Sequence, residues 1–209
     1  MATKVFISAA SNNLLDVVKQ LATHPDLDIK RAVKDGLEKA SEYGHVEVVK
    51  YLLTLSPVDY NYSFRRAAEN GHLEIVELFL KDPCVDPSSN ENYAIQHSSR
   101  NGHVKVVSLL LKDPRVDPTA DKNFAVRSAS TENHLEVVKL LLSDPRVKFD
   151  EVIKEGDKFG RNGDIGLLTK IKAELDEVKP QTQDLKSLLG EDLKTAVAAL
   201  TSAIDRLNA

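Results

Sequence analysis

The sequence of 209 residues contains one cysteine, Cys84, one methionine and no tryptophan. A single cysteine excludes an internal disulfide, a zinc site built from several cysteines and a redox pair of the Cys-x-x-Cys type. Cys84 also has no candidate base near it in the sequence, which argues against a nucleophilic role. The chain is therefore expected to fold without covalent cross-links, in a reducing compartment such as the cytoplasm.

Long hydrophobic runs and an excess of positive charge are lacking as well. No stretch approaches the roughly 20 consecutive apolar residues that a membrane-spanning helix needs, and residues 1–19 contain no continuous hydrophobic region of a secretion signal. There are 28 Lys and Arg against 32 Asp and Glu, so the formal charge is −4 and nothing favours nucleic acid or an anionic membrane. These absences predict a soluble cytoplasmic protein that binds neither nucleic acid nor membrane.

What the sequence does have is an ordinary globular composition, with 42% apolar residues, and an internal repeat. One segment recurs with the pattern Gly-His-apolar-Glu-apolar-Val followed by leucines. The four clear copies are Gly44–Leu53, Gly71–Leu80, Gly102–Leu111 and Asn133–Leu142. Weaker copies begin at Asn13 and Gly163, so the copies are 27 to 31 residues apart. A period of this length indicates one supersecondary unit per repeat.

Each unit reads as two helices followed by a loop. The recurring segment has the apolar spacing of an amphipathic helix, and a shorter helical pattern with small residues precedes it. This first helix carries one apolar position that we expect to be buried, at Phe6, Leu37, Phe64, Ile95 and Val126. Prolines that end the second helix follow at 25, 57, 83, 114 and 145, and aspartates suited to a turn stand at 28, 59, 86 and 117. Because no such unit can bury its apolar face alone, neighbouring units must stack.

These residues resemble the ankyrin repeat, in which Thr-Pro-Leu-His-x-Ala-Ala precedes the Gly-His segment. The resemblance covers residues 1 to about 172. The first half of the motif departs from it, because Tyr62, Tyr93 and Phe124 begin the segments that replace Thr-Pro-Leu-His. The residue before each aromatic is an Asn, and Asn61, Asn92 and Asn123 are therefore predicted to be helix N-caps. In the second repeat Asp35 to Glu38 reads as a capping box. The variant is similar to divergent ankyrin arrays of protists and giant viruses.

The resemblance implies an all-α fold, an ankyrin-type repeat solenoid of helix-turn-helix units joined by hairpin-like loops. Residues 1–178 would form about six repeats, of which the first and the last are degenerate. The loop at 56–60 is short, which predicts a notch between the second and third repeats. Residues 179–209 carry an apolar stripe from Leu189 to Leu207. This predicts a C-terminal helix that caps the solenoid, with self-association into a weak homo-oligomer through 189–207, or binding of a separate partner, as the alternatives.

No catalytic or metal site can be assembled from the sequence. His45, His72, His103 and His134 occur once per repeat, about one repeat thickness apart, which is too far for them to share one metal ion. They are predicted to be structural residues that open the second helices. No set of nucleophile, base and orienting residue can be named either. The chain is therefore predicted to be no enzyme and to use no cofactor or metal.

Without a catalytic or metal site, the candidate functional residues are those on the surface. The resemblance implies that a partner protein binds on the concave face. Carried over position by position, the partner-binding residues are Arg31, Lys34, Glu42, Tyr43, Asp59, Glu69, Asn70, Ser89, Asn90, Arg100, Asn101, Asp121, Thr131 and Glu132. For each of them plain solvation is the competing interpretation. This face has few aromatic anchors, Tyr43 being the chief exception, which favours a polar contact of modest affinity. The predicted function is a protein-interaction scaffold, and a structural subunit that self-associates through its C-terminal helix is the alternative.

Overall fold

The computed structural model describes residues 1–55, 59–158, 166, 168–174 and 176–177. Within these ranges the chain forms helices and no strand. The labelled helices are α1 (Ala2–Ser11), α2 (Leu15–Ala22), α3 (Ile29–Tyr43), α4 (Val46–Leu53), α5 (Asn61–Glu69), α6 (Leu73–Leu80), α7 (Ser89–Arg100), α8 (Val104–Leu110), α9 (Ala120–Thr131), α10 (Leu135–Leu142) and α11 (Phe149–Lys158). Residues 168–174 are helical as well.

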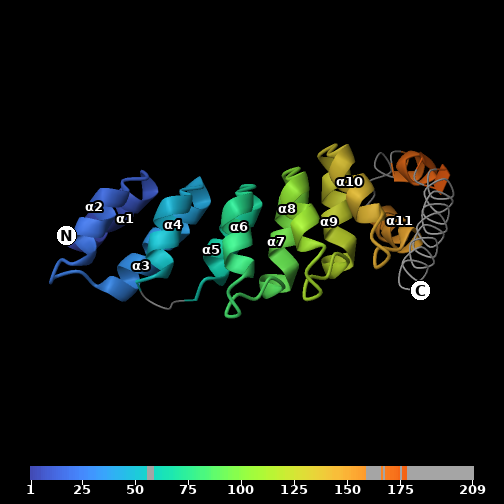
Figure 1. The fold of residues 1–209 in the computed structure, drawn as a ribbon. Helices are drawn as coiled ribbons and strands as arrows, with labels where there is room; N and C mark the ends of the chain where they lie inside the picture. Colours follow the sequence, from blue (N-terminus) through green and yellow to red (C-terminus); the bar gives the residue numbers. More distant parts are fainter. Residues whose placement is uncertain (56–58, 159–165, 167, 175, 178–209) are drawn as a thin grey trace, which may run out of the picture.

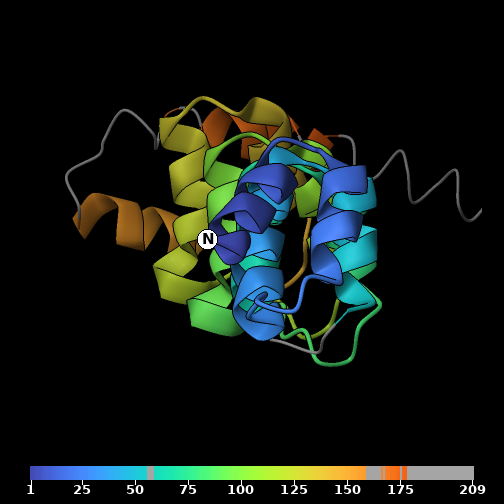
Figure 2. The ribbon, with the colours of Figure 1, turned by 90° about the vertical axis from the view of Figure 1, so that its left-hand side faces the viewer.

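The helices form a row of antiparallel pairs (Figure 1). Each odd-numbered helix, called here a first helix, contacts the first helices of the adjacent pairs, and the even-numbered second helices contact one another in the same way. Figure 2 looks along this row from the N-terminal end. The arrangement confirms the prediction of an all-α repeat solenoid, in which contacts are made between neighbours along the row.

The core follows the predicted apolar position of the first helices. Phe6, Leu37, Phe64, Ile95 and Val126 are all fully buried. Small residues beside them, such as Ala67 and Ala68, are also fully buried and let neighbouring helices approach closely. The second helices α4, α6, α8 and α10 each add a buried pair, for example Val106 and Val107 in α8. Burial of one such large apolar side chain contributes about 1.5 to 3 kcal/mol, so the repeated column accounts for much of the folding energy.

The turn between the two helices of a pair requires a residue with a left-handed backbone conformation, in which φ is positive. Gly44, Gly71 and Gly102 have φ angles of 76 to 78°, a region that glycine enters without strain. At Gly71 an added Cβ atom would also lie 2.5 Å from Nδ1 of His103 in the next repeat. The position is therefore limited both by its backbone angle and by a side chain that packs onto it.

The predicted helix N-caps are wrong. Asn61 is the first residue of α5, and neither it nor Asn92 or Asn123 makes a side-chain capping bond in its own helix. Instead, Oδ1 of Asn61 accepts a hydrogen bond of 2.8 Å from the amide of Asp86, and Oδ1 of Asn92 accepts one of 2.7 Å from the amide of Asp117. Asn61 and Asn92 thus join the start of one first helix to the loop of the next repeat, where each provides an acceptor for a backbone amide.

The capping box predicted at Asp35 to Glu38 is also wrong, because α3 begins earlier, at Ile29. Its N-cap is Asp28, whose carboxylate accepts a hydrogen bond of 3.2 Å from the amide of Arg31. The first residues of α3 therefore correspond to residues that form finger loops in the fourth and fifth repeats. Asp28, an aspartate predicted to stand in a turn, is therefore the N-cap, seven residues before the start of the predicted capping box.

The loops that lead into α7 and α9 form fingers with an uncommon backbone, and each finger includes the non-helical first residues of its helix. Residues 90–92 and 121–123 all have φ angles between 47 and 64°, so each finger contains a short left-handed turn without glycine. Side chains from the regular part of the same helix stabilise these turns. Nε2 of Gln96 donates to the carbonyl of Glu91 at 2.7 Å, and Nε of Arg127 donates to the carbonyl of Lys122 at 2.8 Å.

Some predictions fall wholly or mainly outside the described residues. These are the short loop at 56–60 with its notch, of which 56–58 is not described, the sixth repeat around 163, and the segment 179–209 with its helix at 189–207. At the edge of that region Val152 of α11 is fully buried, and Leu168 and Ile171 are also buried. The described residues therefore continue the core beyond the fifth repeat.

Candidate functional site

The surface best placed for recognition is the solvent-facing side of α3, α5, α7 and α9, called here the first-helix face. In α5 it consists of Tyr62, Arg65, Arg66 and Glu69, which recur at helical spacing opposite the buried face of the helix. The corresponding positions are Tyr93, His97 and Arg100 in α7, and Phe124, Arg127 and Thr131 in α9. Stacking of the repeats therefore aligns polar and aromatic columns along one face.

An ion-pair network joins α3 to α5 on this face. The guanidinium of Arg66 lies 2.9 Å from Oε1 of Glu42 and 2.6 Å from Oε2 of Glu69, and Nζ of Lys39 lies 2.9 Å from Oε2 of Glu42. Hydrogen bonds from Lys39 and then Arg66 lower the pKa of Glu42 below its usual value. Glu42 and Glu69 are half-buried, so both predicted contact residues also hold neighbouring repeats together.

Glu69 is the centre of a second set of contacts, to α7 and to the turn between α7 and α8. The hydroxyl of Tyr93 donates to Oε2 of Glu69 at 3.0 Å, and Nδ1 of His97 lies 4.0 Å from Oε1. The backbone carbonyl of Glu69 accepts Nε2 of His103 at 2.9 Å and Nδ2 of Asn101 at 2.8 Å. Burial lowers the pKa of His97, and burial together with the bond to Glu69 raises the pKa of Tyr93. Both groups are therefore neutral near pH 7.

Five side chains form a continuous row of rings and guanidinium across three repeats. Cζ of Arg65 lies 5.6 Å from the ring centroids of both Tyr62 and Tyr93. Tyr93 stacks on His97 with centroids 3.8 Å apart, and the centroid of His97 is 6.1 Å from that of Phe124. Tyr43 is the aromatic residue that the sequence named for the concave face, whereas the structure also places this row of rings on the first-helix face. Tyr43 is 53% exposed but lies outside this row.

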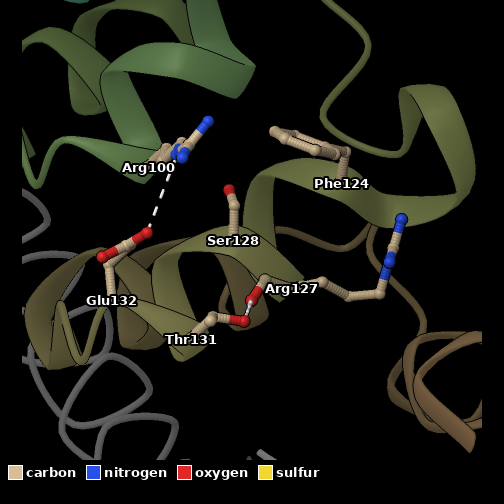
Figure 3. A pocket seen from close by; sticks show the side chains of 6 residues that line it. All are labelled: Arg100, Phe124, Arg127, Ser128, Thr131 and Glu132. Atoms are coloured by element: carbon tan, nitrogen blue, oxygen red, sulfur yellow. Dashed lines mark hydrogen bonds and ion pairs between the residues drawn. The ribbon is translucent and has the colours of Figure 1, made fainter. Parts of the chain in front are cut away.

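Two adjoining hollows lie beside this row. One, of about 240 Å³, is lined by Arg100, Phe124, Arg127, Ser128, Thr131 and Glu132. The other, of about 520 Å³, is lined by Glu69, His97, Arg100, Asn101, Glu132 and His134. Arg100 and Glu132 line both, and Nε of Arg100 lies 3.7 Å from the carboxylate of Glu132. Figure 3 shows this pair on one side of the first hollow, with the Phe124 ring on another and Ser128 between them.

Most of the partner-binding residues predicted from the sequence are exposed. Glu42, Glu69 and Ser89 are half-buried, and the hydroxyl oxygen of Ser89 is buried. The exposed residues are Arg31, Lys34, Tyr43, Asp59, Asn70, Asn90, Arg100, Asn101, Asp121, Thr131 and Glu132. Arg100, Thr131 and Glu132 are brought together around the first hollow.

Other predicted residues are dispersed and bonded locally. Arg31 pairs with Asp35 at 3.6 Å within α3, and Nδ2 of Asn70 donates to the carbonyl of Arg66 at 2.8 Å. The residues predicted from the sequence do not include Arg65, Arg66, Tyr93, His97 and Phe124. Their signal was present in the sequence, because an aromatic residue recurs at 62, 93 and 124 at the period of the repeat.

The histidine column is structural, as predicted. Nε2 atoms of His45, His72 and His103 each lie 2.9 Å from a backbone carbonyl of the preceding repeat. Among the residues that the structure describes, no group of three or more His, Cys, Asp or Glu side chains is placed to hold a metal ion. In the same ranges no helix has both the length and the apolar character required to cross a bilayer.

Comparison with known protein families gives two matches. The family described as ankyrin repeats (3 copies) matches residues 64–151, and the one described as ankyrin repeats (many copies) matches residues 37–80. Together the matched ranges cover more than half of the chain. A search of curated proteins gave no significant match.

Proposed function

Because the chain belongs to the ankyrin repeat family, we propose that it binds a partner protein on the first-helix face, around Arg100 and Glu132. Ankyrin repeats are general protein-protein interaction modules and are typically non-catalytic scaffolds.

The observation that supports it most is the pair of hollows that share Arg100 and Glu132. Elsewhere on this face ion pairs such as Arg66 with Glu42 are half-buried and join neighbouring repeats, whereas the Arg100 and Glu132 side chains remain 52% and 47% exposed. Their long contact of 3.7 Å leaves hydrogen-bonding capacity for a partner. Aromatic and Arg side chains are also the residues that most often dominate binding energy at interfaces.

The remaining predicted contacts extend this surface in both directions. Tyr43 and Asn70 stand at the ends of α3 and α5, in line with Asn101 and Glu132, and Asn90 and Asp121 lie in the fingers. We propose them as peripheral contacts that fix orientation rather than supply most of the affinity. Residues 1–178 are proposed to form the binding unit.

The test is affinity capture from a lysate of the source cells with two variants of equal charge change. Arg100→Glu alters the proposed surface, whereas Lys105→Glu alters an exposed residue of the second helix α8. Proteins that wild type and Lys105→Glu retain and Arg100→Glu loses would support the proposal. A partner retained by Arg100→Glu and lost by Lys105→Glu would place binding on the second-helix side. Circular dichroism of both variants excludes unfolding as the cause.

A further inference from the structure

The first helical pair, α1 and α2, packs against the second pair on one side and is open on the other, at the end that faces the viewer in Figure 2. Four exposed residues of this end occupy positions that contact the preceding repeat elsewhere in the array. They are called here the N-terminal end surface and are Lys4, Val5, Leu14 and Asp16. A terminal repeat usually has a polar outer face, so apolar residues at these positions indicate that another surface covers them.

Val5 is larger than the residues at the equivalent position of the later repeats. Those residues are small and buried, namely Gly36, Ser63, Ala94 and Ala125. At Gly36 an added Cβ atom would lie 3.3 Å from the ring of Phe6 and 3.4 Å from Cβ of Ala10, so this position packs against the preceding first helix. Val5, by contrast, is 47% exposed. A further repeat stacked in the same register would have to shift to accommodate its side chain.

Leu14 has the position of the histidine column. It precedes α2 with φ and ψ angles of −90° and 68°, close to the −84° and 77° of His45 before α4. Nε2 of His45 lies 2.9 Å from the carbonyl oxygen of Ser11 in the preceding repeat. The Leu14 side chain has no hydrogen-bond donor and is 50% exposed. It therefore suits an apolar surface rather than the carbonyl group of another repeat.

The two remaining residues carry opposite charges on the two helices. Lys4 in α1 has the position of Tyr93, whose hydroxyl donates to Glu69 of the preceding repeat at 3.0 Å. Asp16 in α2 has the position of Glu74, which lies 3.0 Å from a lysine of the preceding repeat. The apolar residues thus have a cation beside them on α1 and an anion beside them on α2. Such a surface is complementary in charge to a copy of itself turned by 180°.

We propose that the N-terminal end surface binds the same surface of a second copy of this chain across a two-fold axis. The axis places Val5 of one copy against Leu14 of the other, and Lys4 of one copy against Asp16 of the other, and each contact occurs twice. A hollow of about 380 Å³ at this end, lined in part by Val5 and Leu21, receives the exposed Leu14 side chain of the other copy. The contact does not involve the first-helix face, so it is independent of the proposed function.

The experiment is sedimentation equilibrium of the full chain at concentrations from about 5 to about 500 µM. We expect the average mass to rise from that of one chain toward that of two, with a Kd below about 200 µM, because one helical pair per copy gives only a small interface. Leu14→Glu should raise the Kd at least about tenfold, because it places a charge in the apolar contact. Leu135→Glu changes an exposed leucine of α10, is the matched control and should associate as wild type.

Three results of this experiment would overturn the proposal. The first is the mass of one chain throughout the concentration range. The second is growth beyond two chains, because a two-fold contact closes at the dimer. The third is wild-type association of Leu14→Glu, which would assign self-association to another surface, such as the apolar stripe at 189–207. Circular dichroism of both variants verifies that they fold.

The opposite charges test the two-fold arrangement separately. Lys4→Glu and Asp16→Lys should each raise the Kd at least about threefold, because each places like charges together across the axis. The double variant restores opposite charges and should return the Kd to within about twofold of the wild-type value. A double variant that associates no better than the single variants would overturn the arrangement, and so would single variants with the wild-type Kd.

Discussion

Nε2 of His103 lies 2.9 Å from the backbone carbonyl oxygen of Glu69, which is in the preceding repeat. An imidazole nitrogen facing a carbonyl must be the donor, so this contact fixes the tautomer as well as the position of the ring. The same relationship holds between His72 and Glu42 and between His45 and Ser11. One hydrogen bond per repeat thus connects the start of each of these second helices to the end of the preceding first helix.

Removal of the His103 side chain is expected to destabilise the fold. His103→Ala leaves the Glu69 carbonyl without this donor and removes packing, with an expected loss of about 1 to 3 kcal/mol in the free energy of unfolding. His103→Gln keeps a donor and should lose less. Urea denaturation followed by circular dichroism measures both. His24→Ala, at an exposed position, should change stability by less than about 0.5 kcal/mol, and a loss at His24 equal to that at His103 would contradict the role assigned to the column.

Stability is expected to fall on mild acidification. Burial lowers the pKa of His97 and His103 below the ordinary value of 6.5, with Glu69 opposing this shift at His97 and Arg100 reinforcing it. The unfolded chain then binds protons more readily than the folded one, so stability decreases as the pH falls through about 6.5. Unfolding measured between pH 7.5 and 5.5 should show this decrease. The double variant His97→Gln with His103→Gln should have a shallower dependence, and an unchanged slope would contradict the assignment.

The turn glycines are expected to tolerate no side chain. Gly71→Ala combines a φ angle of 78° with a Cβ atom 2.5 Å from the His103 ring, so we expect a loss of at least about 2 kcal/mol. Gly166→Ala is the matched control, because a Cβ atom there meets nothing within 4 Å. Residue 166 is helical, so alanine should be neutral or slightly stabilising. Thermal unfolding of the two variants would distinguish them, and a Gly71→Ala variant as stable as wild type would refute the explanation.

Asn92 affects stability in two ways, through its hydrogen bond to the next repeat and through its left-handed backbone conformation. Asn92 is buried, has a φ angle of 64° and accepts the amide of Asp117. Asn92→Gly removes the hydrogen bond but relieves the left-handed strain, whereas Asn92→Ala removes the bond and keeps the strain. Asn92→Ala should therefore be the less stable variant by about 1 kcal/mol. Equal stability of the two in urea denaturation would show that the left-handed turn is not maintained.

The fold could be predicted from the sequence because the same pattern of apolar residues and glycines occurs in several repeats. The apolar position from Phe6 to Val126 and the glycines of the turns recur often enough to define a stacked helical unit. Predictions of hydrogen bonds from the residues within a single repeat were wrong. The partner of Asn61 is the amide of Asp86, in the loop of the next repeat, and a local capping rule cannot detect a bond between repeats.

The proposed binding surface was harder to predict for the same reason. The motif resemblance named Glu69 and Glu132 as single exposed positions, but the first is half-buried in contacts with Arg66, Tyr93 and His103. The second acquires its position beside a hollow only when α7 and α9 stack. Side-chain surroundings of this kind arise from the contact between repeats, which a pattern within one repeat does not contain.

Hydrogen exchange of the full chain, alone and with a partner retained in the capture experiment, tests the binding face most directly. If the partner lies on the first-helix face, amide protection should rise in the last turns of α7 and α9, up to Arg100 and Thr131. The second helix α8 (Val104–Leu110) should exchange as in the free protein. Protection confined to α6, α8 and α10 would contradict the proposed face and assign binding to the opposite side of the solenoid.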